Sequence, residues 1–91
     1  MASPDIKDKE GYITEQTHKW NEQAKGIIKA QLARKNIKYH DLARKLNAIG
    51  IEENQNTIAT KLSRGTFSFA FFLQCMYVLG INTIDLNIVE N

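Results

Sequence analysis

Apolar residues recur at steps of three and four along most of the chain, the spacing of amphipathic helices. In a first segment, running from Thr14, or from nearer Trp20, to Arg34 or Lys35, they are Trp20, Ala24, Ile27, Ile28 and Leu32. A second segment, from Tyr39 to Gly50, places Leu42, Ala43, Leu46 and Ile49 on one stripe. The pattern predicts two helices, with Gly50 ending the second.

The segment from Asn54 to Gly65 has few apolar side chains. Ile58 and Leu62 lie four residues apart and point the same way, so amides, hydroxyls and cations occupy the rest of the circumference. We predict a short helix that ends at Gly65. Its polar face suits contact with base edges and phosphates in a DNA major groove, and it also suits an ordinary solvated helix.

The segment from Ser68 to Gly80 predicts a fourth helix that is apolar nearly all round, with Ser68 as N-cap and Gly80 after its end. The stripe assigned to the core contains Phe69, Phe72, Leu73, Met76 and Leu79. The opposite side contains Ala70, Phe71, Cys75, Tyr77 and Val78. A helix of this kind needs cover on more than one side, which we expect from the core and from a second subunit. A small-molecule pocket among Phe67, Phe71 and Tyr77 is the alternative.

The two ends of the chain differ from the middle. Residues 1–13 have no apolar period and are interpreted as a flexible tail, which leaves residues 14–91 as a single domain. Residues 83–88 alternate, which predicts a strand that pairs with its own copy, although a short helix after Asn82 competes. The expected contacts between two subunits are Phe71, Cys75, Val78, Ile84, Leu86 and Ile88.

Composition limits the classes of function. The chain has 91 residues, enough for one core, and a dimer would add stability to so small a domain. Its net charge is +2, but residues 24–80 carry nine lysines and arginines against three acids, an excess compatible either with phosphate contacts or with solubility alone.

The single cysteine argues against a disulfide framework and a Cys/His metal cluster and favours the cytoplasm. We expect no metal or other cofactor. The start of the chain does not indicate secretion, and no apolar run is long enough to span a bilayer, so we expect no membrane association. We find neither a nucleophile paired with a base nor a glycine-rich phosphate loop, and we therefore expect no enzyme.

The order of these segments resembles the Cro/repressor-type (XRE-like) helix-turn-helix domain. Leu42, Ala43 and Leu46 fall on the L-A-x-x-L positions of its second helix. The positions of its S-L-x-x-L-L…A-L-G-V pattern are matched by Ser68, Phe69, Phe72, Leu73, Leu79, Gly80 and Ile81. The resemblance covers about residues 24–86. The chain is also similar to a family of short uncharacterised bacterial proteins with an L-A-x-x-L…G-I-E-x…I-x-x-K-x-x-R-G-x-F-S…F-F-L-Q-C arrangement.

The resemblance implies an all-α, lambda-repressor-like fold of four to five helices with a possible C-terminal dimerisation strand. It implies a dimeric regulator that binds double-stranded DNA. Base contacts would come from Gln55, Asn56, Thr57, Thr60 and Lys61. Phosphate contacts would come from Lys38, Arg44, Lys45, Ser63 and Arg64. The alternative is a protein-interaction module, antitoxin-like or a regulatory subunit, that uses the same fold without sequence-specific DNA binding.

One departure from the family affects this interpretation. The connection at residues 48–53 is longer than the family's tight turn. It ends in Glu52 and Glu53, whose charges favour the N-terminus of the following helix but are expected to repel phosphate.

Overall fold

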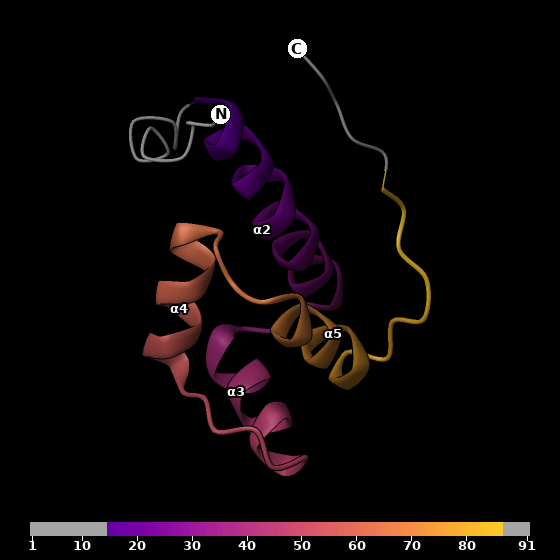
Figure 1. The fold of residues 1–91 in the computed structure, drawn as a ribbon. Coiled ribbons are helices and arrows are strands. Elements are labelled where there is room, and N and C mark those ends of the chain that lie inside the picture. Colours follow the sequence, from indigo (N-terminus) through magenta and orange to yellow (C-terminus); the bar gives the residue numbers. More distant parts are fainter. Residues whose placement is uncertain (1–14, 87–91) are drawn as a thin grey trace.

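Four helices form the part of the chain that the computed structural model describes, residues 15–86 (Figure 1). They are α2 (Glu15–Lys35), α3 (Tyr39–Ala48), α4 (Gln55–Arg64) and α5 (Phe69–Val78). Each coincides with a segment predicted from apolar spacing, so the expected all-α class is confirmed for these residues. Gly26 does not interrupt α2. Thr14, the earlier of the two predicted starts of the first helix, and the predicted tail lie outside the described residues.

The core lies where α3 packs against α4 and α5 and where α2 contacts the same two helices. Its buried side chains come from all four helices and from the residue after α5: Ile28, Leu32, Leu42, Ala43, Leu46, Ile58, Leu62, Phe71, Phe72, Cys75, Met76 and Leu79. The two apolar positions of α4, Ile58 and Leu62, are both fully buried, as their spacing predicts. The polar remainder of α4 is therefore left on the outside.

Three of the helices end in the same way. A residue with positive φ follows the helix, and the next residue donates its amide to a carbonyl five residues back, the bonds of a Schellman motif. The pairs are Asn36 with Ile37, Gly50 with Ile51, and Gly80 with Ile81. Each isoleucine is partly buried against the core. Each turn thus fixes the direction of the chain and adds one apolar contact.

Gly65 ends α4 in a left-handed conformation, with φ of 68°, and its amide donates to the Lys61 carbonyl at 3.0 Å. A Cβ atom at this position would lie 2.6 Å from the backbone oxygen of Asn21 in α2. Glycine is therefore required here for two reasons, the backbone conformation and the close approach of the two helices. The sequence predicts the first reason only.

The orientation of α5 differs from the prediction. Phe69 and Leu73, expected in the core, are 71% and 51% exposed, whereas Phe71 and Cys75, expected at a subunit contact, are buried. An all-round apolar helix has no periodic difference to select its inner face, so the neighbouring helices select it.

Residues 81–86 adopt neither the predicted strand nor the competing short helix. Ile81 and Ile84 pack partly buried against the core, three residues apart, while Leu86 is exposed. The predicted strand would place Ile84 and Leu86 on the same face, whereas only Ile84 packs against the core. Ile88, the last predicted contact, lies outside the described residues.

Candidate nucleic-acid interface

The outer face of α4 is polar. Gln55, Asn56, Thr60 and Ser63, all predicted DNA contacts, are exposed. The helix begins at Asn54, whose side chain accepts the Thr57 amide at 2.9 Å, while the Thr57 hydroxyl accepts the Asn54 amide at 2.9 Å. This reciprocal cap satisfies two backbone donors that would otherwise need water or a ligand. It also commits Thr57, a predicted base contact, to the helix start.

Glu53 occupies the centre of a small side-chain network. Its carboxylate accepts the Thr57 hydroxyl at 2.7 Å and pairs with the ammonium of Lys61, eight residues further along the chain. The Glu53 side chain is only 6% exposed, and that of Lys61 is 39% exposed. The Lys61 nitrogen also lies 4.7 Å from the centroid of the Phe71 ring, within reach of a cation–π interaction.

This network changes the roles inferred for both charges. Glu53 was expected to repel phosphate from the start of α4, but its charge is paired with Lys61 inside the chain. Lys61 was expected to face bases, but its ammonium is held by Glu53 and Phe71. The ion pair between Glu53 and Lys61 could not be predicted from the sequence, because the two residues are eight apart and helical partners lie three or four apart.

The connection between α3 and α4 is held at its other end by Asn47. Its side-chain nitrogen donates to the carbonyl of Ile51 at 2.8 Å and to that of Glu53 at 3.1 Å. The connection, although longer than a tight turn, is therefore hydrogen-bonded to α3 through Asn47 and to α4 through Glu53. Nothing in the sequence pattern distinguished Asn47 from other polar residues on α3.

The predicted phosphate contacts differ in how free they are. Arg44 lies 3.3 Å from the Asp41 carboxylate in an exposed pair. Among the described residues, no ion pair involves the exposed side chains of Lys45 or Arg64. The Lys38 backbone amide donates to the Asp41 carboxylate at 3.1 Å. This hydrogen bond and the nearby charges of His40 and Arg44 lower the pKa of Asp41 below its usual 3.8.

A hollow of about 620 Å³ brings Lys38 and Gln55 together. Its lining also includes Lys29 and His40, which the sequence did not indicate, together with Leu32, Ile37 and Tyr39. The hollow joins the end of α2, the start of α3 and the start of α4. Two lysines therefore flank the first residue of the polar helix.

Cys75 of α5 is fully buried in the core, near enough to Glu53 and Lys61 for their charges to act on its thiol. Burial, with a smaller effect from the Glu53 carboxylate, raises the pKa of its thiol from 9.0 to about 12. The thiol is therefore protonated at neutral pH and is a poor nucleophile. Cys75 therefore packs as a small apolar core residue.

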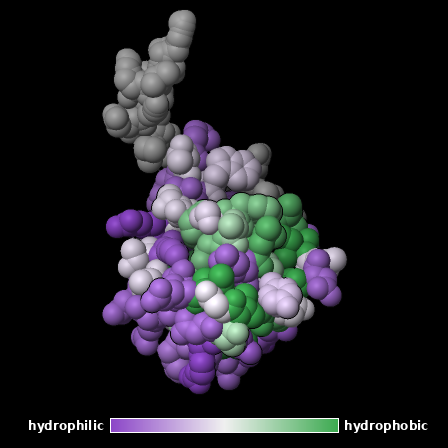
Figure 2. Space-filling view, turned by 60° about the horizontal axis from the view of Figure 1, so that its bottom comes forward, coloured by the Kyte–Doolittle hydropathy of each residue, from purple (hydrophilic) through white to green (hydrophobic). Residues whose placement is uncertain are grey.

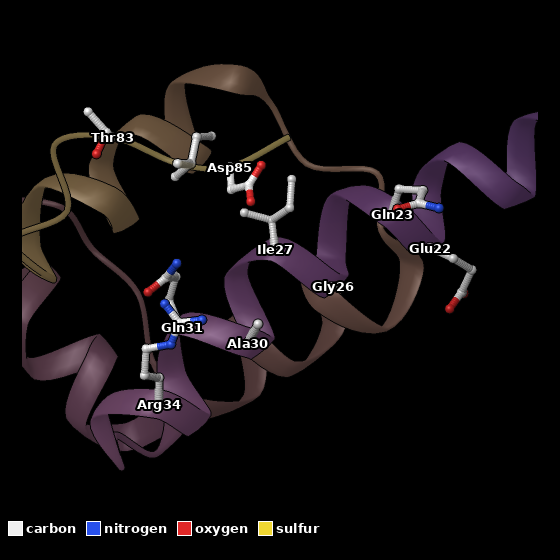
Figure 3. A pocket seen from close by; sticks show the side chains of 10 residues that line it. Glu22, Gln23, Gly26, Ile27, Ala30, Gln31, Arg34, Thr83 and Asp85 are labelled. Carbon is white, nitrogen blue, oxygen red and sulfur yellow. The ribbon is translucent and has the colours of Figure 1, made fainter. Parts of the chain in front are cut away.

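The alternative pocket among three aromatic residues does not form. The Phe67 and Phe71 rings are in contact, with centroids 5.6 Å apart, but Tyr77 is exposed. A different, polar hollow of about 690 Å³ lies between α2 and residues 83–85. Figure 3 shows Ile27 and Gln31 of α2 directed toward the segment that carries Thr83 and Asp85.

Of the predicted subunit contacts, Phe71 and Cys75 are corrected because their side chains are enclosed by the core of a single chain. Val78 and Ile84 are partly buried, and Ile84 packs against the core. Leu86 alone among the described candidates is largely exposed. None of the helices in residues 15–86 combines the length and apolar character needed to cross a membrane.

The chain belongs to a family described as a domain of unknown function (DUF6471), whose model matches residues 20–84. The match begins at Trp20 in α2 and ends at Ile84, so it includes the whole of α3, α4 and α5. No curated protein matches the chain, and no solved structure matches it.

Proposed function

We propose that this protein is a small, non-enzymatic DNA-binding regulator of the lambda-repressor-like helix-turn-helix class, acting in the cytoplasm, with α4 as the helix that enters the major groove. The observation that carries the proposal is the outer face of α4. The face carries exposed amides and hydroxyls, and the charge of Glu53 beside the helix start is paired with Lys61. Of the two acids that directly precede α4 in the described chain, this leaves Glu52 to repel phosphate.

The distribution of charge and the burial of Ile58 and Leu62 support this proposal. With its apolar side fixed in the core, α4 exposes Gln55, Asn56 and Thr60, groups that can pair with base edges. We assign the contacts with the DNA backbone to Arg64, at the end of the helix, and to Lys38, beside its start. Lys61 is assigned to the interior of the network and not to DNA.

The test is a salt titration of binding to random-sequence duplex DNA. Each phosphate contact contributes about 0.9 to the slope of log affinity against log salt. Arg64→Ala and Lys38→Ala should each reduce the slope by about this amount. The double variant Glu53→Gln with Lys61→Met should leave it unchanged, since it removes two charges that already neutralise each other.

A matched control is Lys25→Gln, which removes a cation whose nitrogen lies 3.1 Å from Glu22 on α2. Its slope should equal that of the wild type. Absence of binding at low salt contradicts the proposal. A slope that falls equally for Lys25→Gln and Arg64→Ala shows that α4 is not the contact surface.

A second candidate function is a protein-interaction module that keeps the fold without reading DNA. It is favoured by one observation, the exposed apolar residues Phe69, Leu73 and Tyr77 on α5. DNA binding separates the two candidates, because a pure interaction module has no salt-dependent affinity for duplex DNA.

A further inference from the structure

The face of α5 turned away from the core carries three large apolar side chains at four-residue intervals. Phe69, Leu73 and Tyr77, here named the α5 stripe, are 71%, 51% and 72% exposed. Residues at this spacing lie one above another on a helix. The helix itself contains no charged residue. Figure 2 shows hydrophobic side chains gathered into one patch beside a mainly polar surface.

An apolar hollow of about 540 Å³ adjoins the α5 stripe. Phe69 and Leu73 line it together with Ile27 of α2, Ile84 and the largely exposed Leu86. The Phe69 ring stacks on Phe72, with centroids 5.9 Å apart and planes inclined by 14°, which restrains it although it is exposed. The surface therefore combines a ridge with a neighbouring depression and carries an ordered aromatic side chain at their border.

We propose that a second copy of this chain docks on the α5 stripe and the adjoining hollow, related to the first by a two-fold axis. A ridge of residues at i, i+4 and i+8 packs against its own copy in the commonest helix-crossing class. Two identical uncharged faces meet without repulsion between like charges. A charged partner would find no ion on α5 with which to pair.

The available area also fits a dimer. With about 200 Å² for each fully exposed large apolar residue, the α5 stripe and Leu86 present about 500 Å² per copy. Two copies would then bury about 1,000 Å², the lower limit for a specific interface, and aromatic residues are enriched in such interfaces. This area predicts a weak, reversible dimer. The inference does not depend on DNA binding, because α4 contributes no residue to this surface.

The experiment is sedimentation equilibrium of the full chain from about 1 to 200 μM, a range that brackets micromolar dissociation constants. The wild type should shift from monomer to dimer within this range. Leu73→Glu and Tyr77→Glu should each remain monomeric throughout, because each places a charge within the buried area. Ile49→Glu changes an exposed apolar residue at the end of α3, outside the α5 stripe and the hollow, and should dimerise like the wild type.

Helix content measured by circular dichroism shows whether each variant is folded, and the use of two stripe variants protects the test against the failure of one. A monomeric wild type at every concentration overturns the proposal, even if the protein binds some other partner. A dimer that persists in both folded stripe variants also overturns it, since the contact must then lie elsewhere.

Discussion

The pair between Glu53 and Lys61 gives a sharp test of how α4 is held. Glu53→Gln keeps the size of the side chain and an oxygen that can accept the Thr57 hydroxyl, but it removes the negative charge. Lys61→Met removes the positive charge and keeps an apolar stem beside Phe71. The two substitutions leave different groups without a partner, so their effects on the free energy of unfolding should differ.

The exposures of the two side chains set the magnitudes. Removing one member of a fully buried pair costs about 3 to 5 kcal/mol because the other charge is left unpaired. In Lys61→Met the orphaned carboxylate of Glu53 is only 6% exposed, so we expect a loss of about 3 kcal/mol. In Glu53→Gln the orphaned ammonium of Lys61 is 39% exposed and can turn to water, so we expect about 1 to 2 kcal/mol.

The assay is urea unfolding followed by circular dichroism, with the double variant completing a mutant cycle. The double variant leaves no unpaired charge, so it should lose about 1 to 3 kcal/mol less than the sum of the single losses. A shift of 1 kcal/mol corresponds to about 4 to 8 °C in Tm for a domain of this size, so the differences are measurable. Additive losses, or a neutral Lys61→Met, would refute the assignment of a buried, paired Glu53.

Three further outcomes follow from single positions. Gly65→Ala should lower the free energy of unfolding, measured in urea, by more than Gly50→Ala does. Both glycines have positive φ, which costs alanine about 1 to 2 kcal/mol, but of the two only Gly65 lacks space for a Cβ atom. Equal losses would exclude the close approach to Asn21. Cys75 should react with a thiol reagent at pH 8 only as fast as the protein unfolds, and stability should fall as pH rises from 9.0 toward about 12, since the unfolded thiol ionises first; rapid labelling of the folded protein would contradict its burial. Asp41, whose pKa is lowered, should contribute stability that is present above pH 3.8 and lost as pH falls through its folded pKa, so Asp41→Asn should weaken the acid dependence of the unfolding free energy.

The positions of the helices could be predicted because the determining information is local. Ile58 and Leu62 define the inner side of α4, Ser68 caps α5 through a 3.0 Å bond to the Phe71 amide, and Gly65 ends α4. Each of these effects acts within one or two turns of the chain. A sequence pattern with a short period is sufficient to find them.

The inner face of α5 could not be predicted in the same way. Phe69 and Phe71 are chemically identical, yet one is 71% exposed and the other is buried. The choice depends on how α2 and α3 are placed against the helix, and that placement is set by contacts distant in sequence. When a helix is apolar on all sides, its own sequence does not show which side faces the core.

The role of Glu53 shows most clearly how tertiary structure changes the meaning of a charge. Counted along the sequence, Glu52 and Glu53 form an acidic approach to α4 that opposes DNA binding, and Lys61 forms part of a cationic contact surface. In the structure Glu53 and Lys61 neutralise each other, so one opposing and one favourable charge disappear together. If α4 enters a groove, its specificity must then depend mainly on neutral hydrogen-bonding groups such as Gln55 and Asn56, while Lys38, Lys45 and Arg64 supply the attraction to phosphate. Three such contacts per chain give a slope of about −2.7 for log affinity against log salt. A measured slope steeper than about −4 per chain would require phosphate contacts from cations other than these three.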